Sequence, residues 1–200
     1  MIITHGYGIS VKGEFLMAKV KGVALLSRLQ MLKEHYGDDA YLKVLAALTP
    51  ENRELLTGGG VISSSWYPAE ALKDLDDSID KALKFTHPRA LEELGELTAQ
   101  MGLTTIHKLK IKTTPEETFT RVPQLWSAFH DTGDLEIEAQ PGRAAFRVKG
   151  YGMPHRTFCR NLIGWANKMV ELSGGKNVST KETKCVCNGD DCCEMIVTWE

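Results

Sequence analysis

The chain has 200 residues, of which 42% are hydrophobic and 25% charged, and its formal net charge is -2. This composition is typical of one soluble domain over residues 1–200, and the lack of a basic surplus argues against nucleic-acid binding. No apolar run approaches the ~20 residues of a membrane span, and MIITHGYGISVKGEF lacks a signal-peptide pattern. We therefore expect a cytoplasmic protein with no membrane partner, whose five cysteines are thiols or metal ligands.

Residues 1–132 are expected to be mainly helical. Apolar residues recur at helical spacing from Val23 to Leu32, and Gly37 is suited to end this helix. DDAYLKVLAALT predicts a second helix, and Thr49 followed by Pro50 predicts the start of a third. VISSSWYP predicts a short strand or an extended link. Further helices are expected over about 68–85, 88–102, 103–112 and 114–132, the last despite Pro123.

The pattern changes at Gly133. DLEIEAQ and RAAFRVKGYG alternate polar and apolar residues around Pro141-Gly142, which predicts a hairpin. MPHRTFCRNLIGWANKMVELSGG follows as an amphipathic helix, and NVSTKETKCVC and CCEMIVTW flank NGDD as a last hairpin. This order predicts an α+β fold: an N-terminal helical part packed on a C-terminal antiparallel sheet of about four strands, strand–strand–helix–strand–strand, in residues 133–200.

The last hairpin is rich in cysteine. A two-residue Asn188-Gly189 loop would place Cys185 opposite Cys192, whereas a three-residue loop with a bulge would place it opposite Cys193. The pattern alone leaves both pairings open.

Two more residues could join these thiols. Cys159 on the preceding helix could supply a third thiol, and Glu182 a fourth ligand if the strand bends. Zinc prefers four such ligands in a tetrahedron, and the alternative is buried free cysteine that packs as a small hydrophobe.

The segment from Cys159 to Trp199 resembles the C-terminal half of the 4-vinyl reductase-like domain. That domain senses small molecules, as in the phenol- and toluene-responsive transcription activators. The family's zinc pattern is a helical Cys, then Glu-x2-Cys-x7-Cys. The resemblance implies a closed, structural zinc site whose ligands are Cys159, Glu182, Cys185 and Cys193, with Cys192 as the rival of Cys193.

A looser resemblance covers the rest of the chain. LLSRLQMLKEHYGDDAYLKVLAAL, SSWYP and VPQLWSAFHDTGDLEI are similar to uncharacterised, largely deltaproteobacterial proteins. These are related to the same domain and to the haem nitric-oxide-binding domain. The resemblance implies a ligand cavity between helices and sheet, and dimerisation as in related transport-complex subunits.

Trp126 and Phe129 lie three apart on one helical face, and we expect them to line this cavity for a hydrophobic small molecule. His107 and His130 could supply polar contacts, and core packing is the alternative for the rings. Haem in this superfamily requires an axial histidine, for which His107 is the nearest candidate. It also requires a Tyr-x-Ser-x-Arg motif, which the sequence lacks.

Catalytic motifs are absent from the sequence: there is no Gly-x-Ser-x-Gly, and LTGGGVI lacks the Lys-Ser/Thr of a phosphate loop. We therefore expect a small-molecule-binding sensory domain that is not an enzyme, contains structural zinc and signals through a homodimer or a protein partner. The alternatives are a non-sensing dimeric interaction module and a haem-based gas sensor.

Overall fold

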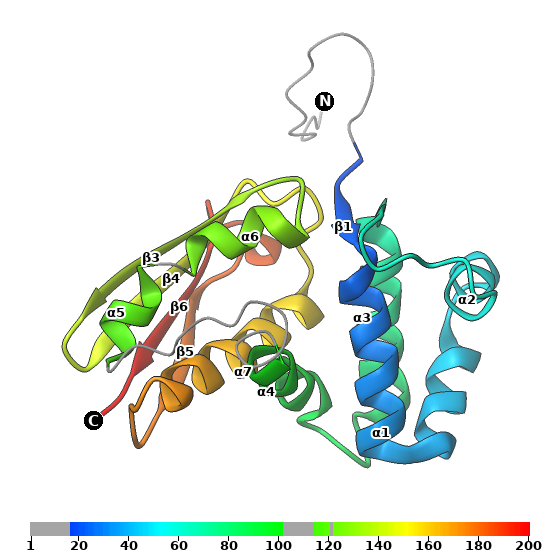
Figure 1. Ribbon diagram of the computed structural model, residues 1–200, viewed down its shortest axis with the longest axis horizontal. Helices are drawn as coiled ribbons and strands as arrows, with labels where there is room; N and C mark the ends of the chain where they lie inside the picture. The colour runs from blue at the N-terminus through cyan, green and yellow to red at the C-terminus, as the bar shows by residue number, and fades with distance from the viewer. Residues whose placement is uncertain (1–16, 102–113, 121) are drawn as a thin grey trace, which may run out of the picture.

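The computed structural model describes residues 17–101, 114–120 and 122–200 (Figure 1). The expected helix over 103–112 and the candidate His107 lie outside these residues. In chain order the elements are β1 (Lys19–Lys21), α1 (Gly22–Ala47), α2 (Pro50–Thr57), β2 (Trp66–Pro68), α3 (Ala69–Leu83), α4 (Ala90–Met101), α5 (Pro115–Phe119), α6 (Pro123–Phe129), β3 (Asp134–Gln140), β4 (Arg143–Lys149), α7 (Arg156–Leu172), β5 (Ser179–Lys184), η2 (Val186–Asn188) and β6 (Cys193–Thr198).

The C-terminal sheet has four antiparallel strands in the order β3-β4-β6-β5. Asp134 of β3 pairs with Lys149 of β4 across the first hairpin. Val148 of β4 pairs with Cys193 of β6. α7 connects the two hairpins, so the predicted strand–strand–helix–strand–strand order and the α+β class are confirmed. A second sheet consists of β1 and β2, paired antiparallel.

Local signals account for several helix ends. Gly37 has φ 82° and interrupts α1, which separates the two helices expected there. Only glycine adopts such angles at little cost. At α2, the Thr49 hydroxyl accepts a hydrogen bond from the Asn52 N–H at 3.4 Å, and Pro50 occupies the first turn as predicted.

The single helix expected over 114–132 is wrong, because two short helices, α5 and α6, occupy this stretch. Pro123 has no N–H to donate, and it disfavours helical angles at the residue before it. It therefore begins α6 instead of continuing α5.

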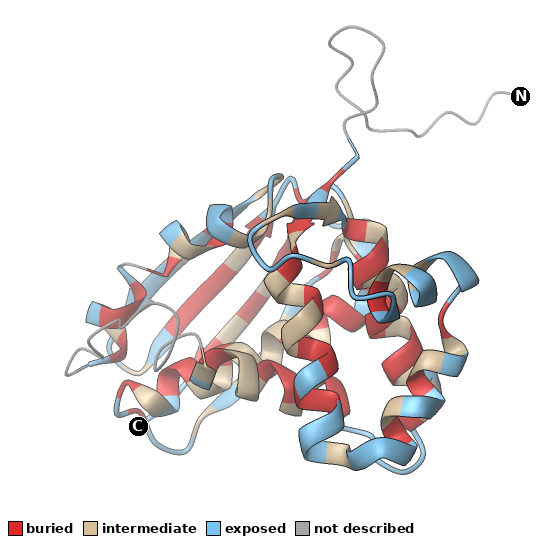
Figure 2. Ribbon diagram, turned by 45° about the vertical axis from the view of Figure 1, so that its right-hand side comes forward, coloured by how far each residue is buried: buried red, intermediate tan, exposed pale blue. Residues whose placement is uncertain are grey.

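Helices cover one face of the sheet. α5 and α6 run along β3, α7 packs on β5 and β6, α4 lies against α7, and α1 and α3 form the outer helical layer (Figure 1). Buried residues gather between these layers (Figure 2). One core cluster includes Phe146, Met169 and Met195, and the other includes Leu25 and Leu72.

The contact between α4 and α7 is unusually close. A Cβ added at Gly164 would lie 1.8 Å from the Glu92 carbonyl oxygen, and one at Gly95 would lie 2.0 Å from that of Asn161. Only glycine at both positions allows these backbones to touch, and this contact fixes α7 relative to the helical layer.

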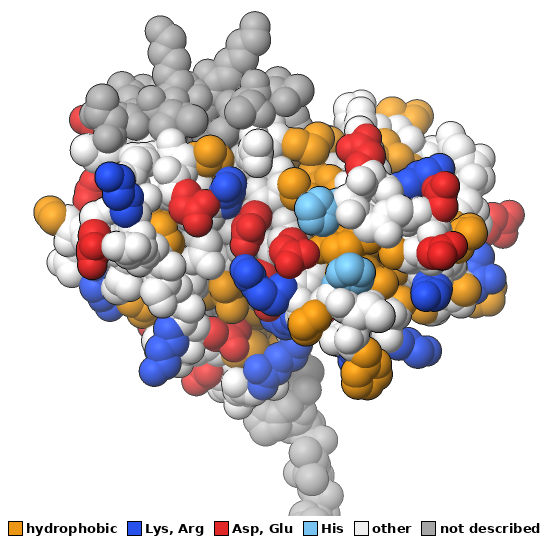
Figure 3. Space-filling view, turned by 90° about the horizontal axis from the view of Figure 1, so that it is seen from below, with side chains coloured by type: hydrophobic (Ala, Val, Ile, Leu, Met, Phe, Trp, Pro, Cys, Tyr) orange, Lys and Arg blue, Asp and Glu red, His pale blue; other side chains and the backbone are white. Residues whose placement is uncertain are grey.

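The surface seen from below shows acidic and basic side chains interspersed (Figure 3). Among the described residues, none of the helices combines the length and the apolar character needed to cross a membrane.

Candidate functional site

A cavity of about 140 Å³ lies where the helical layer meets the C-terminal half. α1, α3, α4, α6, α7 and the start of β3 all contribute to its wall. A dry apolar cavity of about 150 Å³ is enough to hold a benzene molecule. The volume of this cavity therefore matches a molecule of about one ring.

Aromatic side chains form one wall. The Trp126 Nε1–H donates to the Thr132 carbonyl oxygen at 2.9 Å, which fixes the indole. His130 stacks on Trp126 with ring centroids 4.2 Å apart, and Phe158 meets Trp126 edge-on at 6.1 Å. The structure thus brings Trp126, Phe129 and His130 together on the cavity wall. Their role in ligand binding stays a prediction, and His107 lies outside the described residues.

A buried ion pair borders the same cavity. Arg28 on α1 lines it and donates from Nε to Asp76 Oδ1 and from Nη2 to Asp76 Oδ2, the latter at 3.2 Å. His155 Nε2 lies 3.6 Å from the same carboxylate. Burial raises the pKa of Asp76, but the charge of Arg28, with the His155 imidazole and the hydrogen bonds of Arg28, outweighs it and holds that pKa below its usual value.

Sequence reasoning missed this pair, although the sequence contained a signal for it. Arg28 lies between Leu25 and Leu32 on the apolar face of α1, and Asp76 lies four residues after Leu72 on the apolar face of α3. A charged residue at a core-facing helical position implies an oppositely charged partner.

His130 is neutral at physiological pH. Burial, together with the nearby charges of Arg28 and His155, lowers its pKa to about 3. Its Nδ1 atom is buried without a hydrogen-bond partner among the described residues.

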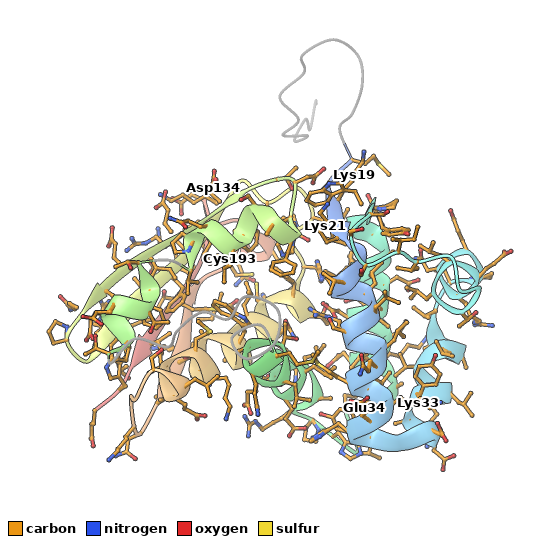
Figure 4. All side chains as sticks on the ribbon, viewed as in Figure 1. Lys19, Lys21, Lys33, Glu34, Asp134 and Cys193 are labelled. Carbon is orange, nitrogen blue, oxygen red and sulfur yellow. The ribbon has the colours of Figure 1, made fainter. Side chains whose placement is uncertain are left out.

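Three of the expected metal ligands do meet. The sulfur atoms of Cys159, Cys185 and Cys193 lie within 4.8 Å of one another, and all three residues are buried. Cys159 donates to Cys193 with the sulfurs 3.6 Å apart. This hydrogen bond lowers the pKa of Cys193 to about 6 and raises that of Cys159. Figure 4 shows Cys193 on the sheet side of the molecule, away from Lys33 and Glu34 at the end of the helical layer.

Glu182 is outside this group of thiols. Its Oε2 lies 3.7 Å from Arg156 Nη1, and its Oε1 is buried without a partner among the described residues. β5 has the irregular register between Glu182 and Lys184 that a shared site would require.

The hairpin loop differs from both sequence alternatives. β5 ends at Lys184 and β6 begins at Cys193, so a longer connection containing η2 and Gly189 at φ 95° replaces the tight turn. Folding of this connection brings Cys185 to Cys193, whereas Cys192 is buried outside the cluster.

The fold resembles solved H-NOX proteins. One from S. oneidensis in the Fe(II)NO ligation state is 15% identical, with TM-score 0.66 over 90% of this chain and 99% of that chain. One from K. algicida in the unliganded Fe(II) state is 12% identical, with TM-score 0.66 over 90% and 96%. A third, from work on heme distortion in the H-NOX family, is 8% identical, with TM-score 0.62 over 90% and 95%.

Scans against family models and curated proteins found no match. The solved H-NOX structures agree with the expected haem nitric-oxide-binding superfamily in the fold alone. The 4-vinyl reductase-like label and the deltaproteobacterial relatives are not confirmed.

The predicted structural zinc is wrong by this comparison. Work on one of the solved proteins that share the fold concerns its heme and others are in Fe(II) states, so the comparison offers no counterpart for a structural zinc. The physical basis for zinc is also incomplete, because the expected fourth ligand, Glu182, is not in the thiol cluster. Three buried thiols, of which Cys159 donates to Cys193, are weak evidence for a metal.

The described lining does not fit a haem. A space of about 140 Å³ is suited to one ring, whereas a porphyrin contains four joined rings. Arg28, the charged side chain among the described lining residues, is already paired with Asp76 and is not free for two propionates. His130 lines the cavity, and its Nδ1 atom is buried. The chain thus shares its fold with solved H-NOX proteins and has a ring-sized cavity among its described residues.

Proposed function

We propose that this protein is a small-molecule-binding sensory domain whose ligand occupies the cavity between α1, α6 and α7. The observation that supports this is an apolar cavity walled by Trp126, Phe129 and Phe158 at the meeting of the two layers. Such a position suits a sensor, because a ligand there contacts elements of both layers at once. We propose binding without catalysis, because Arg28 in the described lining is paired with Asp76 and the Nδ1 atom of His130 is buried.

Output through a homodimer or a protein partner, in the cytoplasm, is part of the proposal. The fold likeness to H-NOX proteins supports the sensory role. A dimeric interaction module that binds no ligand is the alternative.

Native mass spectrometry of the purified protein tests the binding role. The wild type should retain a small molecule, or take one up from a fragment library. Ala99→Leu should lose this, because Ala99 lines the cavity and a larger side chain would fill it. Ala46→Leu, on an exposed position of α1, is the matched control and should bind as the wild type does. Folded Ala99→Leu protein that retains the same molecules would contradict the proposed site.

A second candidate is a haem-based gas sensor, which the likeness to Fe(II) H-NOX proteins favours. Haem absorbs strongly in the Soret region, so a spectrum of protein produced with added haem separates the two. We expect no Soret band. One haem per chain, with the band weakened in His107→Ala, would support the gas sensor and contradict direct binding of a ring-sized molecule.

A further inference from the structure

The dipeptide Asn188-Gly189 lies in the exposed connection between β5 and β6, where η2 ends. The asparagines elsewhere in the chain precede residues with larger side chains; they are Asn52, Asn161, Asn167 and Asn177. An asparagine side chain can react with the backbone nitrogen of the residue that follows it. Glycine favours this reaction, because it has no Cβ to shield that nitrogen and its backbone rotates freely.

The reaction is a deamidation that needs only water. The backbone nitrogen of Gly189 bonds to Cγ of Asn188 and gives up its proton, the bond from Cγ to Nδ2 breaks, and ammonia leaves. Water then cleaves one of the two C–N bonds of the resulting succinimide ring, which produces aspartate or isoaspartate. On balance water replaces ammonia, without an oxidant or a reductant.

Arg156, the first residue of α7, holds the reacting side chain. Its Nη2 donates to Asn188 Oδ1, while its Nη1 lies 3.7 Å from Glu182 Oε2. Negative charge develops on Oδ1 when the nitrogen of Gly189 attacks, and the guanidinium stabilises that charge in the same way as an oxyanion-hole donor. Because the Arg156 side chain is 58% exposed, water screens its charge, so we expect only a several-fold acceleration.

The backbone around Gly189 has room for this attack. Gly189 has φ 95°, which glycine adopts at little cost, and a Cβ there would meet no atom within 4 Å. Its N–H donates to the Val186 carbonyl oxygen at 3.0 Å, the bond that ends η2. This bond must open before the nitrogen can attack, and a single exposed turn opens at little cost in free energy.

We propose that Asn188 is a site of spontaneous deamidation in the folded protein, accelerated by Arg156. This modification is independent of ligand binding in the cavity, since the loop between β5 and β6 does not line it. Conversion to aspartate preserves the backbone and places a carboxylate beside Arg156.

Conversion to isoaspartate has a larger effect, because it changes the backbone next to a buried thiol. The Cys185 carbonyl oxygen accepts from the backbone N–H of Asn188 at 2.8 Å and from that of Asp190 at 3.3 Å. Isoaspartate adds a carbon atom to the backbone between these two donors, so both hydrogen bonds cannot persist. The loop then opens, and the buried Cys185 becomes accessible to solvent.

Incubation of the purified full chain at physiological temperature and pH, followed by peptide mapping with mass spectrometry, tests the proposal. We expect Asn188 to convert faster than each of the other asparagines, with isoaspartate among the products. Arg156→Gln should slow this conversion several-fold, and Arg156→Lys, which keeps the positive charge, should slow it less. Arg143→Gln, at an exposed position of β4, is the matched control and should convert at the wild-type rate.

The unfolded chain provides a second control. In urea the fold no longer holds Arg156 against Asn188, so wild type and Arg156→Gln should convert at the same rate. Conversion of Asn188 in the folded protein that is no faster than at the other asparagines would overturn the proposed site. A folded Arg156→Gln variant that converts as fast as wild type, or a difference that persists in urea, would overturn the role of Arg156.

Thiol labelling tests the consequence for Cys185. Folded wild-type protein should gain a maleimide-reactive Cys185 in proportion to its isoaspartate content, whereas Asn188→Gln incubated alongside it should gain neither. A Cys185 that stays unreactive in protein rich in isoaspartate would contradict the proposed opening of the loop.

Discussion

Removal of Arg28 should destabilise the protein strongly. In Arg28→Met, Asp76 loses its charged partner and keeps only the His155 imidazole, with Nε2 at 3.6 Å. The intact pair is buried, with side-chain exposures of 4% for Arg28 and 0% for Asp76. Breaking a buried ion pair by removing one partner costs about 3–5 kcal/mol. For a chain of this size each kcal/mol shifts the melting temperature by ~2–4 °C, so we expect a decrease of roughly 10 °C. Urea unfolding at pH 7 measures the free energy directly.

The pH dependence gives this prediction a second readout. The pKa of Asp76 in the folded state lies below its usual value of 3.8, so the ion pair contributes stability above about pH 4 that is lost as the pH falls through the folded-state pKa. In Arg28→Met, protonation of Asp76 removes the unpaired charge. Burial without the Arg28 charge favours the neutral acid, so this protonation begins above pH 4, and the difference in the free energy of unfolding between wild type and variant should shrink as the pH falls from 7 through 4.

The matched control is Arg89→Met, which breaks an exposed pair with Glu96 at 3.0 Å and should cost less than about 1 kcal/mol. The double variant Arg28→Met/Asp76→Leu should recover much of the loss, because it leaves no buried charge. A cost below about 1 kcal/mol for Arg28→Met, or a difference independent of pH, would refute this reasoning about the buried pair.

Three further predictions concern packing, protonation and assembly. Gly164→Ala should lower the free energy of unfolding in urea by about 1–3 kcal/mol, because its Cβ would lie 1.8 Å from the Glu92 carbonyl oxygen. The control is Gly60→Ala, at an open position, where the free energy of unfolding should change little. The folded-state pKa of His130 is about 3, whereas its usual value is 6.5. Between these pH values the unfolded chain takes up a proton that the folded chain excludes. The free energy of unfolding should therefore fall by up to about 1.4 kcal/mol per pH unit from pH 6.5 toward 3. His130→Phe should remove that part of the slope between pH 7 and 5, and an unchanged slope would argue against a buried neutral imidazole. Sedimentation at high micromolar concentration should show a homodimer; a species of only 22.2 kDa would contradict the predicted assembly.

The sequence by itself determined the local elements and their class. Helical periodicity from Val23 to Leu32, the cap at Thr49 and the alternation in DLEIEAQ and RAAFRVKGYG each depend on neighbours a few residues away. The same period-based reasoning placed Trp126 and Phe129 on a common face, and both line the cavity. These features are readable because burial of a helix or strand face imposes a repeat on the sequence itself.

Only the tertiary structure decided which distant residues meet. Arg28 and Asp76 are 48 residues apart, and their pairing depends on how α1 packs on α3. Cys185 approaches Cys193 because the loop between β5 and β6 is longer than any tight turn, which the letters CVCNGDDC do not reveal. The cavity is a product of layer packing, since its wall draws on six separate elements. No local pattern encodes such a volume, because it is the space that packed side chains leave between them.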